Sequence, residues 1–352
     1  MADNNDSKKG NFKMKLLTTA LIGLAALVVA SPASRAEGVL DRVKARGELR
    51  CGVGDPTPGW HSLDNQNRWV GFGVDFCRAV SAAVLGDATK IAINPIGWAQ
   101  SYEALRSGEV DIVTTSHTYK IERDTGMQVN FPTAYFFTGI TVMTRKESEV
   151  RSFEDLAGAT ICILSGSSME ATVSEWFRAK NLPVKLVPFD TITANSEAYS
   201  KGRCDAFATE PALLAGFRQG YADAEDHEIL NDLFSVDALG PMVAEGDEQW
   251  NNIVRSVIFA TIAADQYGLT ADNAAEIAES SDNASIRRLL GTEGELGKFM
   301  GLPADWGLQI ITQVGPYSAI YDRNLGKDSA SKIEPGFNRY VSQGGLLYSP
   351  GF

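Results

Sequence analysis

Residues 108–124 read GEVDIVTTSHTYKIERD, and the fold is best inferred outward from this stretch. Residues 110–113 are a short, mostly apolar segment of the kind that forms a buried strand. Polar side chains, most of them hydroxyls, follow without a break through residue 120, and Arg123 comes soon after. In open α/β sheets, ligands bind beyond the carboxyl ends of the strands. The stretch therefore predicts a sheet strand that ends at a ligand site.

The sequence on both sides alternates between strand and helix patterns, and it does so twice. In the first half, strands are predicted at 48–53, 69–72, 91–96 and 110–113, and helices at 74–84 and 101–106. In the second half, strands are predicted at 159–164, 184–188 and 205–208, and helices at 165–180, 192–200 and 211–216. Further helices are expected at 249–266, 283–290 and 306–314. This alternation is typical of α/β proteins with mostly parallel strands and predicts two lobes.

Four strand ends in this pattern are candidates for the site. They are residues 54–61 and 114–123 in the first lobe, and residues 165–169 and 209–211 in the second. The carboxyl ends of parallel strands meet at one edge of a sheet, and each lobe contributes two of these strand ends. We expect the two edges to face each other and to form a site that both lobes share.

The first 36 residues have the pattern of a secretory signal peptide. Four lysines precede the 15-residue apolar run LLTTALIGLAALVVA, and the small residues of SPASRA follow it. This order predicts cleavage near Ala36 and export across the membrane. The alternative is a membrane anchor, but the run is shorter than the roughly 20 residues that span a bilayer.

The charge of the chain excludes some classes of partner. The sequence has 32 Lys and Arg against 44 Asp and Glu, a net charge of −12. Residues 1–36 hold five basic and two acidic residues, so the remainder has 27 basic and 42 acidic residues and a net charge of −15. A surface this acidic does not suit nucleic acid or an anionic membrane face.

The chain has four cysteines, and an even number in an exported protein predicts two disulfides. They are Cys51, Cys77, Cys162 and Cys204, and their spacing alone allows three pairings. Because no CxxC motif occurs and the three histidines are scattered, no metal site is predicted.

Arg123 is the basic side chain that best fits a binding role. A guanidinium has a fork of N–H donors that matches a carboxylate in two places. The alternative is a surface ion pair with a neighbour such as Glu122 or Asp124. Position in the sequence does not separate these two interpretations.

Two features of the second half complement that arginine. In Ser165-Gly166-Ser167-Ser168, Ser167 and Glu170 fit a capping box, and a helix start presents free N–H groups to an anion. Glu210 follows the strand at 205–209 and has the charge to bind an ammonium group. The alternatives are an ordinary capped helix and a solvated glutamate.

Aromatic residues at strand ends add a third feature. Trp60 and Tyr119 lie in two of these loops, and Trp98 lies in another segment. Such rings cover an apolar side chain or a cation, although core or rim positions are more common. The combined set describes a receptor for a zwitterion rather than a catalytic site, since no GxSxG, HExxH or phosphate-loop motif occurs.

The chain resembles a known family over nearly its whole exported length, from about Leu40 to Phe352. The stretches that carry the resemblance are LDRVKARGELRCGV, GFGVDFCRAVSAAVLGD, LRSGEVDI, ERDTGMQVNF, SFEDLAGATICI, KGRCDAFATE, LGPMVAEGDEQW and RRLLG. They are similar to the periplasmic solute-binding proteins of polar amino-acid ABC transporters, solute-binding protein family 3, and most closely to the general L-amino-acid-binding proteins.

The resemblance implies a type II periplasmic-binding-protein fold, with two α/β lobes joined by two crossover strands. We place these strands near Ile140–Arg145 and Gly240–Ala244. The first lobe then comprises residues 37–142, the second lobe residues 143–241, and residues 242–352 return to the first lobe and add a C-terminal helical extension. It also implies the disulfides Cys51–Cys77 and Cys162–Cys204, one in each lobe.

The resemblance further assigns site residues by position. Arg123 corresponds to the arginine that binds the ligand α-carboxylate, and Ser116 and Thr118 to hydroxyls that hold the carboxylate and the ammonium. Gly166 and Ser168 belong to the loop of the second lobe that donates to the carboxylate. Glu210 stands where an acid holds the ammonium, and Trp60 where an aromatic ring covers the ligand. Tyr119 is a further candidate.

Several positions depart from the family pattern. Glu210 replaces the usual aspartate, residues 115–119 differ from the run in close relatives, and Gly73 replaces an aspartate that would cap a helix. Trp98 adds a ring near the site. These changes leave the carboxylate anchor intact but alter the rest of the site. A methylated ammonium solute, surrounded by the three aromatic rings, is therefore an alternative ligand.

The predicted function is that of a monomeric binding subunit of an ABC importer, which closes on an amino acid and delivers it to a membrane permease. No cofactor or nucleic-acid partner is expected. A rival prediction is a periplasmic enzyme of the same fold that dehydrates a cyclic acid, with His117 or Glu210 as the general acid. Another is a sensory protein that presents its ligand to a membrane receptor.

Overall fold

The computed structural model describes residues 37–352, so the predicted signal peptide and its cleavage site lie outside the described residues. Across residues 37–352, no helix combines the length and apolar character needed to cross a bilayer. The chain begins this part with helix α1 (Val39–Arg46), and two sheets of unequal size follow.

The first sheet is small and parallel. Its three strands are β1 (Leu49–Val53), β4 (Ile91–Pro95) and β5 (Ile112–Val113), in the order β4-β1-β5. Helix α2 (Phe72–Leu85) connects β1 to β4 after a short hairpin, and α3 (Ser101–Arg106) leads to β5. We name the part built on this sheet lobe 1. Its strands end at residues 53, 95 and 113, and the polar stretch that begins with Thr114 follows the last of them.

The larger sheet forms lobe 2. Its order is β11-β7-β10-β8-β9, with β8 (Thr160–Leu164), β9 (Lys185–Phe189) and β10 (Ala206–Thr209) parallel to one another. Strands β7 (Phe136–Arg145) and β11 (His227–Ile229) run antiparallel at one side. Helices α5 (Ser168–Ala179), α6 (Ile192–Ser200) and α7 (Pro211–Gln219) follow β8, β9 and β10. Each parallel strand therefore points its carboxyl end at the start of a helix.

Strand β7 belongs to both parts of the molecule. Its first half pairs with β12 (Ser235–Leu239), and its second half pairs with β10 and β11. After β12 the chain returns at once to lobe 1, where Met242 pairs with Val113 and β13 (Val243–Ala244) pairs with β6 (Val129–Asn130). The chain thus leaves lobe 1 along β7 and returns along β12. The second connection is therefore β12, and the prediction that it lies at Gly240–Ala244 is wrong, because residues 242–244 already pair within lobe 1. The lobe boundaries at residue 142, within β7, and residue 241, just after β12, remain proposals.

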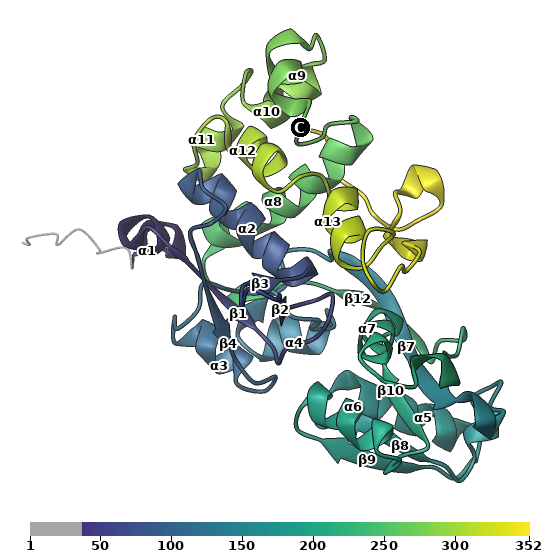
Figure 1. Ribbon diagram of the computed structural model, residues 1–352. Coiled ribbons are helices and arrows are strands. Elements are labelled where there is room, and N and C mark those ends of the chain that lie inside the picture. Colours follow the sequence, from purple (N-terminus) through teal and green to yellow (C-terminus); the bar gives the residue numbers. More distant parts are fainter. Residues whose placement is uncertain (1–36) are drawn as a thin grey trace, which may run out of the picture. The chain divides into compact units, whose positions relative to one another are not determined.

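Lobe 1 receives most of the remaining helices. They are α4 (Ile121–Gly126), α8 (Glu248–Gln266), α9 (Ala274–Ser280), α10 (Ala284–Leu290), α11 (Leu296–Met300), α12 (Trp306–Gln313) and α13 (Tyr317–Asn324). Helix α2 packs on β1, and α8 and α12 pack on α2 (Figure 1). Helix α2 is apolar almost all round because it is covered on both sides, and 12 of its 14 residues are buried.

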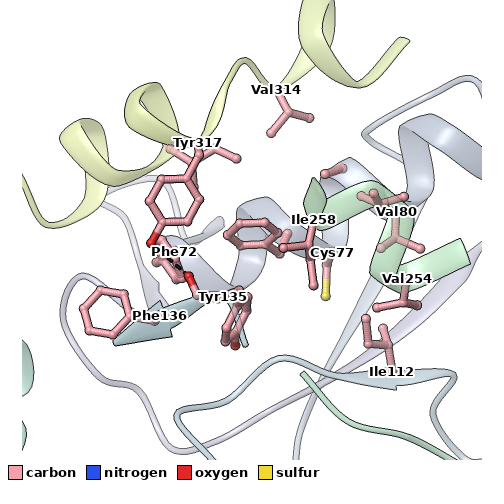
Figure 2. Packing of buried hydrophobic residues seen from close by; sticks show 14 of the residues in the cluster. Phe72, Cys77, Val80, Ile112, Tyr135, Phe136, Val254, Ile258, Val314 and Tyr317 are labelled. Carbon is pink, nitrogen blue, oxygen red and sulfur yellow. Dashed lines mark hydrogen bonds between the residues drawn. The ribbon is translucent and has the colours of Figure 1, made fainter. Parts of the chain in front are cut away.

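Aromatic rings fill the core between α2, β7 and α13. Phe72, Tyr135, Phe136 and Tyr317 gather there (Figure 2), with ring centroids 5.4 to 5.8 Å apart for the three pairs that Phe72 makes with the others. The Tyr317 hydroxyl donates to the Tyr135 carbonyl at 2.8 Å. Such edge-to-face contacts add about 0.5–1.5 kcal/mol per pair to the burial of the rings.

The C-terminal segment attaches to the strand that links the lobes. The side-chain amide of Asn338 accepts from the Phe137 N–H at 2.7 Å and donates to the Phe137 carbonyl at 2.9 Å. These are the two bonds that a neighbouring strand would make. Because Phe137 lies in β7, the extension stabilises the connection between the lobes.

The four cysteines form the predicted pairs. Cys51–Cys77 ties β1 to α2 in lobe 1, with Cα atoms 6.3 Å apart, and Cys162–Cys204 ties β8 to the turn before β10 in lobe 2, with Cα atoms 5.6 Å apart. They close loops of 26 and 42 residues. Loops of these lengths correspond to a stabilisation of about 3–4 kcal/mol for each bridge.

Candidate functional site

A pocket of about 600 Å³, part of it open to solvent, lies at the strand ends of both lobes. Lobe 1 contributes Gly54, Asp55, Thr57, His61, Trp98, Thr115, Ser116 and Thr118; lobe 2 contributes Leu164, Ser167, Ser168, Met169, Asp190, Ile192, Thr209, Glu210 and Leu213. The predicted residues Ser116, Thr118, Ser168 and Glu210 are therefore brought together.

A hydrogen bond between two lining hydroxyls joins the lobes at the pocket. Thr118 Oγ1 and Ser168 Oγ lie 3.0 Å apart, although the residues are 50 positions apart in sequence. Thr118 is held in place by a bridge to Leu239, and Ser168 is the first residue of α5. A hydroxyl from each lobe is thus available to the same ligand group.

The start of α5 differs from the predicted capping box. Ser167 donates its hydroxyl to the Leu164 carbonyl at 2.7 Å, so its side chain does not accept from the helix N–H groups. Glu170 accepts instead from the Gly166 N–H at 3.0 Å, and Gly166 has the positive φ of 65° that the turn requires. Gly166 shapes the turn but does not line the pocket. The first N–H groups of α5 are left for another acceptor.

Arg123 lies next to the lining residues rather than among them. Only 9% of it is exposed, and Nη1 donates to the Thr118 carbonyl at 3.0 Å. Its guanidinium carbon lies 5.7 Å from the centre of the Trp98 ring. Among residues 37–352 no carboxylate lies within 4.0 Å of it, so the alternative of a surface ion pair with Glu122 or Asp124 is wrong. A buried cation without a counterion is suited to an anionic ligand.

Glu210 is the buried acid of the pocket. It is 5% exposed and precedes α7 as its N-cap residue, and Oε2 accepts from Thr209 Oγ1 at 2.7 Å. Burial raises its pKa to about 7, an effect to which Asp237 adds and which Arg123 opposes. The carboxyl group is therefore partly protonated near neutral pH. An ammonium group bound beside it would favour the ionised form.

Two further residues of the loop after β1 line the pocket. His61 is buried, its Nδ1 has no hydrogen-bond partner within the described part of the chain, and burial lowers its pKa to about 4. Its ring is thus neutral at physiological pH. Asp55 is half-buried, and burial raises the pKa of its carboxyl group.

His117 does not line the pocket but contacts two residues that do, Trp98 and Thr115. Its ring stacks on Trp98 with centroids 3.7 Å apart, Nε2 lies 3.1 Å from Ser101 Oγ, and Nδ1 is bonded to Thr115 Oγ1. Burial and the nearby Arg123 charge hold the pKa of His117 well below its usual range. The ring is neutral and fixes the orientation of Trp98.

Two of the predicted aromatic residues do not reach the pocket. Trp60 is fully buried in the lobe 1 core, where it packs on Phe72 and Phe136 and donates Nε1 to the Thr114 carbonyl at 3.3 Å. Tyr119 stacks on Phe131 and is 38% exposed. The prediction that Trp60 covers the ligand is therefore wrong, and Trp98 is the ring at the pocket.

Sequence reasoning also missed lining residues. Asp190 was overlooked because β9 extends one residue past the predicted strand, so Asp190 directly follows the strand end. The strand-end loop at 54–61 is one of the predicted parts of the site, but only Trp60 in it is predicted as a ligand contact. The residues of this loop that line the pocket include Asp55, Thr57 and His61. Among residues 37–352, no group of three or more His, Cys, Asp or Glu side chains is placed to hold a metal ion.

Comparison with known proteins identifies the family. Residues 49–273 match the model of the bacterial extracellular solute-binding proteins, family 3. The chain belongs to this family. A family 3 protein has the type II periplasmic-binding-protein fold, which the two α/β lobes and the β7 and β12 connections display, so the predicted fold class is confirmed.

Relatives of this solute-binding protein match it end to end. The general L-amino acid-binding periplasmic protein AapJ of Rhizobium johnstonii is 38% identical over 340 residues, which cover 96% of this chain and 99% of AapJ. The glutamate/glutamine/aspartate/asparagine-binding protein BztA of Rhodobacter capsulatus is 36% identical over 334 residues, 95% of this chain and 99% of BztA.

A solved structure is also similar. The ABC transporter/periplasmic binding protein from Brucella ovis, with glutathione bound, has a TM-score of 0.87 and 37% identity, and the match covers 89% of this chain and 99% of that one.

Proposed function

We propose that this family 3 protein is the binding subunit of an ABC importer and that it takes an amino acid or a related zwitterion into the pocket between its lobes. The observation that carries the proposal is the opposition of charges. A buried guanidinium that has no counterion among residues 37–352 contacts one lining residue, Thr118, and the other lobe supplies a buried carboxyl group, Glu210. AapJ and BztA are named for the amino acids that they bind.

The two ionic groups of the ligand have distinct partners in this proposal. The α-carboxylate binds Arg123, the Ser168 hydroxyl and the free N–H groups at the start of α5, where the helix dipole also favours an anion. The α-ammonium binds Glu210 and the hydroxyls of Ser116 and Thr118. Trp98 takes the covering role first assigned to Trp60. Glutathione, the ligand of the Brucella ovis protein, also carries a free α-amino and α-carboxylate group.

Binding is coupled to closure of the lobes in this proposal. Thr118 and Ser168 lie within hydrogen-bond distance of one another, so a ligand group bound beside this pair contacts both lobes at once. Only the closed form offers both sets of contacts, so the ligand shifts the population towards it. The closed form is what the permease receives. Export to the periplasm, cleavage at Ala36, the monomeric state and the permease partner are parts of this proposal.

The rival functions find less support. Of the two general acids in the enzyme prediction, His117 is held neutral by burial, whereas Glu210, with a pKa raised to about 7, keeps the protonation that the role requires. AapJ and BztA are both named as binding proteins, and neither is named as an enzyme. The aromatic cage for a methylated ammonium loses two of its three rings, since Trp60 and Tyr119 lie outside the pocket lining.

Calorimetry with a panel of amino acids tests the proposal. The wild-type protein is expected to bind at least one of them, and Arg123→Met to lose affinity by roughly 100-fold or more, because the ligand carboxylate loses its charged partner. Arg151→Ala is the control, since Arg151 is exposed and lies outside the pocket lining. An Arg123→Met variant that is folded and binds every ligand as the wild type does would overturn the proposal.

A further inference from the structure

The charges that line the pocket are strongly unbalanced. Three of the lining residues, Asp55, Asp190 and Glu210, are carboxylates, and none is Lys or Arg. None of the three forms an ion pair within residues 37–352. Arg123 is the cation next to the lining, through its contact with Thr118.

A simple zwitterion leaves most of this charge unused. Its carboxylate occupies Arg123 and its ammonium occupies Glu210, so the two aspartates still face the pocket without a cation. Carboxylates that face a partly closed pocket repel a further negative charge and attract a positive one. The pocket is therefore suited to a ligand that carries one more positive charge than negative.

The two aspartates come from loops that face each other across the lobes. Asp55 follows β1 in lobe 1, and Asp190 follows β9 in lobe 2. Thr193 Oγ1, near Asp190, lies 3.5 Å from the carbonyl oxygen of Pro56, next to Asp55. A second contact between the lobes, Thr118 with Ser168, involves other loops. Asp55 and Asp190 therefore both line the pocket, and they lie in loops that meet at a different contact from the one between Thr118 and Ser168.

Other groups in the lining fit a cation on an aliphatic stem. His61 is 4% exposed, lines the same pocket and carries a buried Nδ1 that lacks a hydrogen-bond partner within residues 37–352. In the neutral ring this nitrogen accepts a hydrogen bond when the proton is on Nε2. The side chains of Met169, Ile192 and Leu213 provide apolar lining. Long basic side chains place methylene groups on such surfaces and extend the charge beyond them.

We propose that Asp55 and Asp190 form a second cation subsite and that the preferred ligand is an amino acid with a cationic side chain, of the arginine or lysine class. The inference rests on the proposed function, since Arg123 and Glu210 must hold the α-groups. The subsite is complete only when the lobes are together, because each lobe supplies one aspartate. An acidic side chain in the same place meets two like charges.

Calorimetry with arginine, lysine, glutamine, glutamate and glutathione tests this assignment. Arginine or lysine is expected to bind roughly 10-fold more tightly than glutamine, and glutamate and glutathione more weakly than glutamine. Asp55→Asn lowers arginine affinity by about 10-fold and leaves glutamine affinity within about 3-fold. Asp190→Asn, at an exposed position, lowers arginine affinity by about 3-fold.

The control is Asp232→Asn, which makes the same charge change at an exposed residue of lobe 2 that does not line the pocket. It is expected to leave all affinities unchanged. Raising the salt concentration should weaken arginine binding more than glutamine binding, because the extra ion pair is partly solvated. The preference for arginine over glutamine and its salt dependence are measured on the wild-type protein. These two measurements therefore test the proposal even if a variant misfolds.

The outcomes separate the two proposals. A wild-type protein that prefers glutamine or glutamate over arginine, or an Asp55→Asn variant that weakens all ligands equally, overturns the cation subsite. If Arg123→Met still abolishes binding in that case, the amino-acid function stands. If no amino acid binds the wild type, both proposals fail.

Discussion

The pocket residues fall into two groups, named here the buried end and the open end, that are built on opposite principles. At one end, Thr118 and Ser168 are buried and bonded to each other, and the buried Arg123 contacts Thr118. At the other end, Asp55 is half-buried and Asp190 exposed, and neither has an ionic partner in the described residues. Buried charge-assisted bonds are strong, whereas exposed pairs contribute little. The buried end is therefore suited to affinity for any amino acid, and the open end to selection among side chains.

After substitution of Arg123, substitution of Glu210 is expected to cause the largest loss of ligand affinity. Glu210→Gln removes the counterion of the ligand ammonium, and we expect affinity to fall by roughly 30-fold or more for every amino acid. Calorimetry with arginine and glutamine checks this. A loss of affinity for arginine alone would contradict the contrast between the two ends, because Glu210 would then belong to the open end that selects among side chains.

The pH dependence of the same residue sharpens the test. The pKa of about 7 belongs to the ligand-free protein, so below it the carboxyl group must lose a proton before it binds an ammonium. Affinity is therefore expected to be about tenfold weaker at pH 6 than at pH 8, and Glu210→Gln to be flat over this range. Proton release on binding, measured in two buffers of different ionisation enthalpy, provides a second readout.

The same shift has the opposite sign for the stability of the empty protein. A carboxyl group whose folded pKa is raised stabilises the fold while it is protonated, and this contribution is lost as the pH rises towards about 7. Glu210→Gln is therefore expected to raise Tm of the ligand-free protein at pH 8 and to change it little near pH 4. An unchanged Tm at pH 8 would indicate that Glu210 is less buried than the structure shows.

Ser168→Ala gives a smaller effect at the buried end. It removes one hydroxyl that donates to the ligand carboxylate but leaves Arg123 and the N–H groups of α5. We expect affinity to fall by about 10-fold, and by the same factor for arginine and glutamine. Competition binding of the two amino acids measures the factors, and clearly different factors would contradict a shared anchor.

Tyr119→Leu gives the smallest effect. Tyr119 was a sequence candidate, but it stacks on Phe131 outside the pocket lining. Affinity is expected to stay within about twofold, as for substitutions away from a binding site. A tenfold or greater loss of affinity would indicate that Tyr119 contacts the ligand and that the binding site includes residues outside the pocket lining described above.

The sequence predicted the general plan well because that plan depends on local patterns and on resemblance. The family, the two-lobe fold and the disulfides Cys51–Cys77 and Cys162–Cys204 are confirmed. Ser116, Thr118, Ser168 and Glu210 line the pocket because each follows the carboxyl end of a strand. The resemblance selected Ser116 and Thr118 from the polar stretch, whereas the positions of Ser168 and Glu210 at strand ends also indicated them.

Prediction failed where the direction of a side chain depends on a turn. The loop after β1 closes between Thr57 and His61, whose backbone groups bond at 2.7 and 3.0 Å. The Trp60 indole donates to the Thr114 carbonyl and lies in the core, while the next residue, His61, lines the pocket. Spacing alone does not decide between adjacent residues. Asp190 was missed for a related reason, because β9 ends one residue later than its pattern indicated.

The most direct test of the account is a crystal structure of the protein with the amino acid that binds most tightly. The account predicts the α-carboxylate within about 2.7–3.2 Å of Ser168 Oγ and the Arg123 guanidinium, and the α-ammonium at the same distance from a Glu210 carboxylate oxygen. A ligand bound in the reverse orientation, or bound without contact to either Arg123 or Glu210, would contradict it.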